Sequence, residues 1–442
     1  MKTFHRLVVN TLIASVTNNF LWFALTFWVY LETRSVIASS VIGGSYMLLL
    51  SVSALFFGTY VDHHLRKASM LASSGGSLAA YLLAAAVYFV APEGSLQDFG
   101  HPAFWALVVL VLGGAIAGNL RSVALSTTVT LLVPEDSHDK ANGLVGTVNG
   151  VAFALTSVFS GLSIGFLGMG WSLGIAVVLT MLAAAHLLGI RIEGDRAGVA
   201  GDQPKTVDFR GAFRAVRVVP GLLLLLFFTT FNNFLGGVFM ALMDPYGLTL
   251  VSVETWGLVL GAVSFGFIAG GIFVARKGLG SHPLRTLLLT NMALWTITIL
   301  FPLRSSIVLL AIGFVIYTAL IPVVEASEQT IIQRVVPFEE QGRVFGFAQM
   351  MESAASPVTA FLIGPIAQVW VIPFMTDGAG ADAVGSWFGT GSDRGMALVF
   401  MAAGVIGLVV TILAMRSSGF DDLSSRYAKS RTEPDVTQAV QA

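Results

Sequence analysis

Long apolar runs constrain the fold of this chain more than any other feature. A helix needs about 20 mostly apolar residues to cross a hydrocarbon core about 30 Å thick. Of the 442 residues, 55% are hydrophobic and only 11% are charged, which excludes a water-soluble globular fold. We predict an all-α membrane protein with twelve transmembrane helices. The expected spans are 7–31, 36–60, 68–91, 103–133, 142–167, 170–190, 218–243, 253–275, 284–303, 307–335, 343–373 and 394–416.

The basic residues predict how the chain is oriented. An even number of spans places both termini on the same side of the membrane. If that side is the cytoplasm, only Arg34, Arg304 and Arg394 of all lysines and arginines fall outside. Cytoplasmic loops normally carry the excess of basic residues. We therefore expect a multi-pass protein of the cell inner (plasma) membrane with both termini in the cytoplasm.

The two halves of the chain resemble each other. The first span carries SVTNNFLWFAL at 15–25, and the seventh carries TTFNNFLGGVF at 229–239. The ends of the fourth and tenth spans also correspond, with Pro134 matching Pro337. A repeat of about half the chain length is typical of a transporter built from two related bundles with a site between them.

These repeats and the loop lengths predict the domain organisation. We expect two pseudo-symmetric six-helix bundles at 1–190 and 218–416. The connection 191–217 should end in a short amphipathic helix on the anionic cytoplasmic surface, because its phenylalanines and arginines fall on different faces. Residues 417–442 are polar, and we expect a cytoplasmic tail without ordered structure.

Two carboxylates interrupt the apolar segment 315–346. Glu325 and Glu328 are three residues apart, so on a helix they share a face with Gln329. An ionisable side chain at membrane depth costs at least about 2.5–3.5 kcal/mol, so it normally faces a bundle interior or a watery cavity. Both glutamates are therefore candidates for a functional site.

The connection after the second span carries a family motif. In GTYVDHHLRK, the residues Gly58, Asp62, Arg66 and Lys67 match the signature loop of the major facilitator superfamily, which the chain resembles from residue 1 to about 416. His63 and Leu65 depart from the usual arginine and glycine. The pattern at 333–346 looks most like the drug:proton antiporter branch that holds macrolide exporters, other multidrug exporters and the enterobactin exporter.

The resemblance implies that helices 1, 4, 7 and 10 line a central cavity. The polar and aromatic residues of those helices are our candidates for the substrate cavity. They are Asn18, Asn19, Phe20, Asn119, Asn232, Asn233, Phe234, Tyr317 and Gln329. For the asparagines, hydrogen bonding between helices is an equally open interpretation.

The position of Arg121 suggests a proton-coupling site. Arg121 lies 13 residues before Pro134, and Glu325 lies 12 before Pro337, so both should lie at similar depth. We expect Arg121 to face Glu325 or Glu328. One cation cannot fully compensate two buried carboxylates, so one glutamate should carry a proton near neutral pH. A structural latch and direct contact with a charged substrate remain the alternatives.

Other polar residues suggest a cytoplasmic gate. Conformational switching needs polar pairs that form in one state and break in the other. We assign Asp62 and Arg66 to gating or helix capping, and place Gly58, Lys67 and Arg343 with them. Glu352 is either part of this gate or a second proton site.

The sequence predicts a proton-coupled exporter of bulky, largely apolar organic compounds such as antibiotics, working by alternating access. We expect a monomer whose partners are a small-molecule substrate, protons and the lipid bilayer. The alternatives are a dedicated exporter of a siderophore or lipid-like metabolite, a proton-driven importer, and a transport-dead receptor or complex subunit. The chain has no cysteine and no nucleotide-binding, zinc or nucleophile motif. We therefore expect no enzyme activity, cofactor, metal site or nucleic-acid partner.

Overall fold

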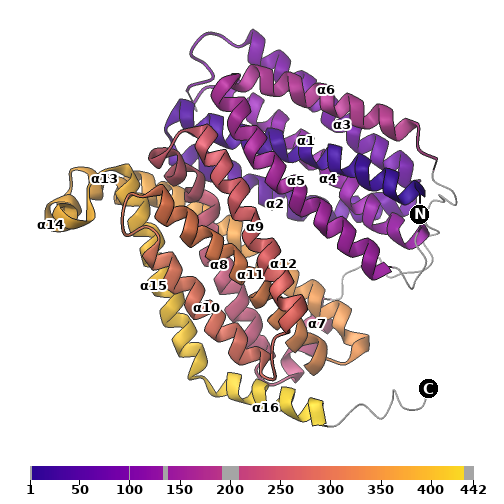
Figure 1. Ribbon diagram of the computed structural model, residues 1–442, viewed down its shortest axis with the longest axis vertical. Coiled ribbons are helices and arrows are strands. Elements are labelled where there is room, and N and C mark those ends of the chain that lie inside the picture. Colours follow the sequence, from indigo (N-terminus) through magenta and orange to yellow (C-terminus); the bar gives the residue numbers. More distant parts are fainter. Residues whose placement is uncertain (1, 99, 133–137, 192–208, 433–442) are drawn as a thin grey trace. The chain divides into compact units, whose positions relative to one another are not determined.

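The computed structural model describes residues 2–98, 100–132, 138–191 and 209–432, and this part of the chain consists of helices and their connections (Figure 1). In several helical stretches, including 125–132, 138–151 and 338–343, only the backbone is described. Most of the expected linker 191–217 and Pro134 lie outside the described residues.

The described part contains 11 helices that are long and apolar enough to cross a membrane. A further helix, α5 (His138–Phe166), contains the shorter apolar stretch Ala152–Phe166. These helices confirm the expected all-helical membrane architecture. The 11 candidates lie in α1 (Lys2–Thr33), α2 (Val36–His63), α3 (Arg66–Val90), α4 (Pro102–Leu132), α6 (Gly168–Leu188), α8 (Leu222–Leu250), α9 (Val253–Lys277), α10 (Pro283–Leu300), α11 (Ile307–Val335), α12 (Phe338–Ile366) with its extension to Thr376, and α15 (Ser392–Met415).

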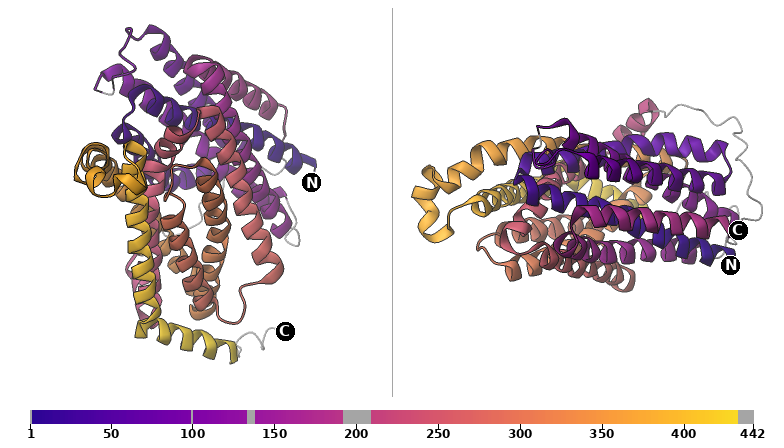
Figure 2. Two further views of the ribbon diagram at one scale, coloured as in Figure 1. Left: turned by 60° about the vertical axis from the view of Figure 1, so that its left-hand side comes forward. Right: turned by 90° about the horizontal axis from the view of Figure 1, so that it is seen from above.

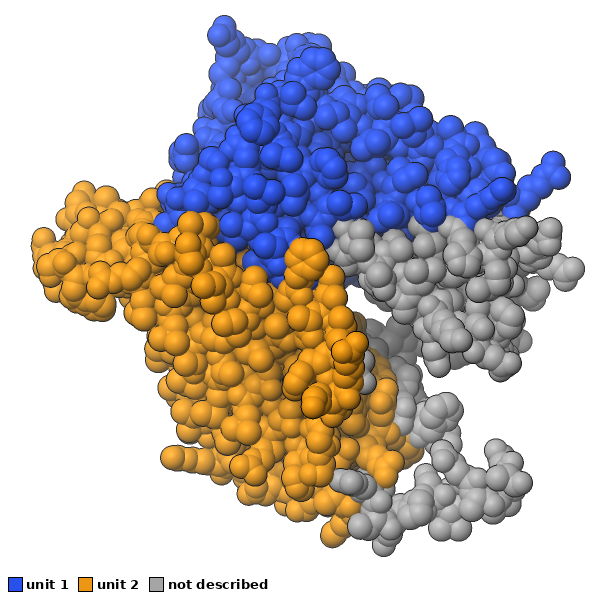
Figure 3. Space-filling model, in the orientation of Figure 1, with its two compact units in different colours: residues 1–203, 241–264 blue, residues 204–240, 265–442 orange. Residues whose placement is uncertain are grey.

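The chain forms two compact units, coloured separately in Figure 3. Unit 1 comprises residues 1–203 and 241–264, and unit 2 comprises 204–240 and 265–442. Within each unit the long helices lie alongside one another (Figure 2). The expected division into bundles at 1–190 and 218–416 stays a prediction.

Small residues bring the helices of unit 1 close together. Ser73 and Ser77 of α3 donate hydrogen bonds to the carbonyl oxygens of Ala117 (2.7 Å) and Gly114 (2.8 Å) on α4. A side chain at Gly257 of α9 would place its Cβ 2.5 Å from the carbonyl oxygen of Ser157 on α5. Serine and glycine therefore mark close helix contacts here, as is typical of membrane helices.

Unit 2 contains a hydrophobic core that several helices share. The short helix α7 (Phe209–Val218) is the amphipathic helix expected at the end of the linker. Its Val216 is buried in a cluster with Leu222 and Leu225 of α8, while Arg214 and Arg217 are exposed. The apolar face of α7 thus packs against unit 2 itself, and Phe213 also meets Phe347 of α12 at 6.2 Å between ring centroids.

The segment after Arg416 differs from the expectation. We expected no ordered structure there, but residues Ser418–Thr432 form helix α16. Phe420 and Leu423 are buried in the same core cluster, and Tyr427 packs against it. These three residues have helical spacing, so one apolar stripe anchors a segment whose average composition is polar.

Other boundaries also differ from the sequence-based spans. Helix α8 ends at Leu250, seven residues later than expected, and continues through Pro245. Helix α12 is followed by a π-helical turn, η2 (Ala367–Val371), and by α13 (Ile372–Thr376). A helix that we did not expect, α14 (Ala379–Phe388), comes just before α15 in the chain and lies beyond the amino-terminal end of α15 (Figure 1).

Two neighbouring glycines of α9 allow a matched test of helix packing. A Cβ on Gly270 would lie 2.1 Å from the carbonyl oxygen of Ala319 on α11, whereas a Cβ on Gly271 would meet nothing within 4 Å. We expect Gly270→Ala to lower the unfolding temperature in detergent, because backbone atoms cannot move aside cheaply. Gly271→Ala should raise it slightly, because alanine favours a helix by about 1 kcal/mol. Equal effects of the two substitutions would contradict this packing.

The core role of α16 predicts a second pair of effects. Leu423→Ala should destabilise unit 2 by about 2–5 kcal/mol, the usual range for removing a buried leucine side chain. Ser424→Ala, at the next and exposed position, should leave stability unchanged. Thermal unfolding of both variants in the same detergent is the measurement. An unaffected Leu423→Ala variant would show that α16 is not part of the core.

Candidate functional site

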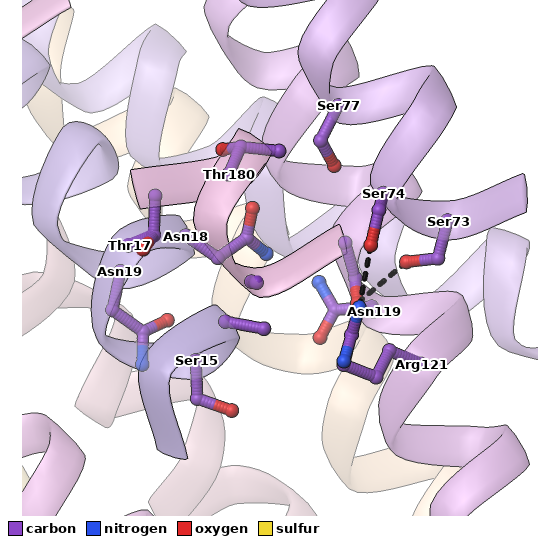
Figure 4. A pocket seen from close by; sticks show the side chains of 13 residues that line it. Ser15, Thr17, Asn18, Asn19, Ser73, Ser74, Ser77, Asn119, Arg121 and Thr180 are labelled. Carbon is purple, nitrogen blue, oxygen red and sulfur yellow. Dashed lines mark hydrogen bonds between the residues drawn. The ribbon is translucent and has the colours of Figure 1, made fainter. Parts of the chain in front are cut away.

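A polar pocket of about 220 Å³ lies inside unit 1, between α1, α3, α4 and α6 (Figure 4). Its lining consists mainly of hydroxyl and amide side chains, and the charged residue among them is Arg121. The full lining is Ala14, Ser15, Thr17, Asn18, Asn19, Ser73, Ser74, Ser77, Gly118, Asn119, Arg121, Thr180 and Ala183. Three predicted cavity residues, Asn18, Asn19 and Asn119, and the predicted coupling residue Arg121 thus meet in one pocket.

Arg121 is held by neutral partners. Its side chain is only 3% exposed, and its guanidinium donates hydrogen bonds to Asn10 Oδ1 and Ser74 Oγ. The Asn10 amide is itself fixed, because its Nδ2 donates to the carbonyl oxygen of Ala183 at 2.8 Å and lies 3.1 Å from Nδ1 of His186. The guanidinium is therefore positioned by side chains of α1 and α3 that carry no compensating negative charge.

Asn18 joins three helices. Its Nδ2 donates to the carbonyl oxygen of Ala115 on α4 at 2.7 Å, and its Oδ1 accepts from the hydroxyl of Tyr81 on α3 at 2.7 Å. Asn119 bonds back to Ala115 at 3.2 Å within α4. Hydrogen bonding between helices, the alternative left open by the sequence, therefore describes Asn18 well. Phe20 is 3% exposed and is not among the residues that line the pocket.

A cluster of carboxyl groups lies in unit 2. Glu325 and Glu328 of α11 come close enough to Glu352 of α12 for their charges to interact, and the carboxyl groups of Glu328 and Glu352 lie within hydrogen-bonding reach of each other. Thr229 Oγ1 of α8 donates to Glu328 Oε1 at 3.0 Å. Oε1 of Glu352 is buried and has no hydrogen-bond partner among the described residues. A hydrogen bond between two carboxyl groups requires a proton on one of them, because ionised carboxylates only accept.

The other predicted residues of unit 2 take mostly packing roles. Oδ1 of Asn232 accepts from the indole of Trp295 at 3.0 Å, and Asn233 Nδ2 donates to the carbonyl oxygen of Thr229 at 3.1 Å. The ring of Phe234 stacks with that of Phe231, and the ring of Tyr317 stacks with that of Phe239. Gln329 is exposed.

The signature-loop residues lie around the start of α3. Lys67 Nζ donates to the carbonyl oxygens of Leu188 (2.9 Å) and Ile190 (2.5 Å), at the end of α6. This is a C-terminal capping contact, where a cation also suits the helix dipole. Arg66 begins α3 and is half-buried. The side chains of Asp62 and Arg343, and the surroundings of Gly58, lie outside the described residues.

The expected pairing of Arg121 with Glu325 or Glu328 joins residues of different units, so it stays a prediction. Within unit 1 the structure adds Asn10, Ser74 and Tyr81 to the polar site. The sequence offered only a weak signal for them, because isolated serines and asparagines are also common in close helix packing.

Sequence reasoning missed one half-buried acid inside a helix, Asp244. Its Oδ1 accepts a hydrogen bond from the indole of Trp256 at 3.0 Å. The expected helix ended at residue 243, which placed Asp244 in a loop. Because α8 continues through Pro245, Asp244 belongs to the helix, and an acid inside an apolar helix would have been the signal.

Comparison with known proteins decides the family. The sequence profile described as "Major Facilitator Superfamily" matches residues 7–360. The chain belongs to the major facilitator superfamily. A curated relative, described as the uncharacterized MFS-type transporter YjbB of Bacillus subtilis (strain 168), is 21% identical over 349 residues, which covers 77% of this chain and 82% of that protein.

Solved structures of facilitators share the fold. A bacterial homologue of the human lysosomal transporter Spinster, in an inward-facing and unoccupied conformation, matches with a TM-score of 0.67 at 14% identity, covering 98% of each chain. A structure from a study of proton-dependent oligopeptide transporters matches with a TM-score of 0.63 at 13% identity, covering 96% of this chain and 100% of the other. At these identities the likeness shows the fold alone.

Membership establishes the general activity. This facilitator is a multi-pass membrane protein and a secondary active transporter, and its family comprises transporters rather than enzymes. Facilitators bind small-molecule substrates and are often proton-coupled.

Two adjacent threonines test the surroundings of Glu328. Thr229 donates to Glu328, whereas the buried hydroxyl of Thr230 has no partner among the described residues. Thr229→Val should destabilise the protein by about 1–3 kcal/mol, because a buried carboxyl group loses a hydrogen bond. Thr230→Val should be neutral or stabilising, because it removes an unsatisfied hydroxyl. Thermal unfolding in detergent measures both, and the reverse order would refute the contact.

Proposed function

We propose that this facilitator is a proton-coupled exporter in which the carboxyl groups of Glu325, Glu328 and Glu352 carry the transported proton. The closeness of the Glu328 and Glu352 carboxyl groups supports this more than any other observation, because two carboxyl groups can share a hydrogen bond only when one of them holds a proton. Glu325 is exposed on unit 2, which gives the cluster a route for proton exchange. Glu352 thereby becomes part of the proton site, rather than of the gate that was its alternative in the sequence.

The three carboxyl groups can couple the inward movement of protons to the outward movement of cargo. A proton bound from the outside neutralises the three carboxyl groups in part and allows them to stay close together. Cargo that arrives from the cytoplasm would displace this proton, and proton release on the inside would reset the site. Each proton that crosses contributes about 2.3 kcal/mol per 100 mV of membrane potential, in addition to the pH gradient.

The distribution of basic residues supports a protein of the cell inner or plasma membrane with both termini in the cytoplasm. The protein would act as a monomer and export its cargo. The resemblance of residues 333–346 to the drug:proton antiporter branch favours bulky, largely apolar organic compounds such as antibiotics as cargo. The stacked rings of Phe231 and Phe234, which are half-buried, could contact such compounds.

A second candidate is a dedicated exporter of one product, such as a siderophore or lipid-like metabolite. The polarity of the Arg121 pocket favours a dedicated exporter of a polar product over one of a lipid-like product, because hydroxyl and amide groups select for hydrogen-bonding cargo and discriminate against apolar compounds. The phenotype of cells that lack this protein separates the two candidates. Loss of a drug exporter should make the cells sensitive to many unrelated compounds. Loss of a dedicated exporter should instead cause one metabolite to accumulate inside the cells.

The proton site predicts the behaviour of glutamine variants. Glu328→Gln and Glu352→Gln should each remove the infrared band of a protonated carboxyl group that the wild-type protein retains at neutral pH. In proteoliposomes with an imposed pH gradient, at least one of Glu325→Gln and Glu328→Gln should lose gradient-driven transport of ethidium or erythromycin, by tenfold or more. All three glutamine substitutions should leave the fold intact, because glutamine keeps the shape of the glutamate side chain.

Glu32→Gln is the matched control, since Glu32 is an exposed glutamate at the end of α1. It should keep both the infrared band and the transport. If Glu325→Gln and Glu328→Gln both retain full dependence on the pH gradient, these carboxyl groups are not the coupling site. An infrared band that persists in both Glu328→Gln and Glu352→Gln would assign the proton to another group.

A further inference from the structure

The Arg121 pocket combines a fixed cation with a polar lining and little space. At about 220 Å³ it is smaller than the range of about 300–1,000 Å³ that is usual for drug-sized ligands. It corresponds to the liquid volume of about seven water molecules. A bulky apolar compound would therefore not fit inside it, whereas a small polar metabolite would.

The charge of the pocket is not balanced by its own lining. Among the described residues that line it, Arg121 is the charged side chain and no acid accompanies it. Its partners in unit 1, Asn10 and Ser74, are neutral. A guanidinium has five N–H donors, and these two contacts leave others available to a ligand. A buried cation with neutral partners is costly in free energy, and a bound anion would offset that cost.

The geometry of the cation selects the type of anion. Guanidinium groups bind carboxylates through two parallel hydrogen bonds. Arg121 donates a hydrogen bond to Asn10, and Asn10 is itself held by contacts with Ala183 and His186. A ligand would therefore meet a guanidinium that is already fixed in position. One positive charge balances one carboxylate, whereas a phosphate carrying more than one negative charge would leave part of its charge uncompensated.

The remaining lining recognises groups beside the carboxylate. Thr17, Ser77 and Thr180 are buried in the wall, and Ser15, Asn19 and Asn119 are half-buried and more accessible. Hydroxyl and amide groups can donate and accept hydrogen bonds, so they suit a ligand with hydroxyl substituents.

We propose that the pocket between α1, α3, α4 and α6 binds a small hydroxylated carboxylic acid, with its carboxylate on Arg121 and its hydroxyl groups on the surrounding serines, threonines and asparagines. This inference rests on the proposed export function, because the acid bound in the pocket would be the exported cargo. It would make the protein a dedicated exporter of one polar product rather than a drug exporter.

Equilibrium binding to the full-length protein in detergent tests the proposal, with gluconate as the acid and glucitol as its neutral counterpart. Wild-type protein should bind gluconate at least tenfold more tightly than glucitol. Arg121→Gln should abolish this preference, and Arg121→Lys, which keeps the charge but loses the planar fork, should retain part of it. Equal affinity for the two compounds, or an unchanged preference in Arg121→Gln, would overturn the proposal.

A second variant fills the pocket without touching Arg121. Ala14 lines the pocket on α1, so Ala14→Leu should weaken gluconate binding tenfold or more while every hydrogen bond of Arg121 stays in place. Ala72→Leu is its control, because Ala72 is exposed on α3 and lies outside the pocket lining. If Arg121→Gln fails to fold, Ala14→Leu decides: unchanged gluconate affinity in this variant would place the ligand elsewhere.

The preference for gluconate over glucitol is measured at equilibrium and without a pH gradient, so it reports the acid site whether or not the protein transports. Glu328→Gln should keep this preference even where it no longer transports, because the preference depends on Arg121. Loss of gluconate preference in Arg121→Gln with intact proton coupling supports the acid site. Loss of coupling in Glu328→Gln with no gluconate preference in wild type refutes the acid site and leaves the proposed exporter standing.

Discussion

A polar side chain inside a membrane protein must find its hydrogen-bond partners within the protein, because hydrocarbon offers none. Both units are arranged around this requirement. In unit 1, Arg121 is satisfied by Asn10 and Ser74, and Asn18 is held between Ala115 and Tyr81. In unit 2, Glu328 accepts a hydrogen bond from Thr229. The helices that supply these partners are thereby fixed in register with one another.

Small residues make these polar contacts possible. Ser73 and Ser77 of α3 reach the carbonyl oxygens of α4 only because the two helix backbones lie close together. The same closeness at Gly257 and Gly270 leaves no space for a side chain. Close backbone contact and polar bonding between helices therefore support each other, and neither needs a hydrophobic driving force between helices.

The two units carry different chemistry on related sequences. Asn18 and Asn232 occupy equivalent positions in the repeat, yet Asn18 borders a pocket that contains a cation, whereas Asn232 bonds to Trp295 in the packed interior of unit 2. The clustered acids Glu325, Glu328 and Glu352 lie in unit 2, on α11 and α12. We propose that cargo binds in unit 1 and the proton in unit 2. With this division, the binding of either one would favour the same conformational change of the transporter.

The sequence by itself determined the class of the protein and the helices, because an apolar run of sufficient length has no stable alternative to a membrane helix. It also singled out Arg121, Glu325, Glu328 and Glu352, since ionisable groups are conspicuous in apolar surroundings. Only the tertiary structure decided their partners. Serine, threonine and asparagine are common in helix packing, so nothing in the sequence marked Ser74 or Asn10 as the anchors of Arg121, or Thr229 as the donor to Glu328. The order of α16 likewise depends on contacts with distant segments of unit 2, which local composition does not contain.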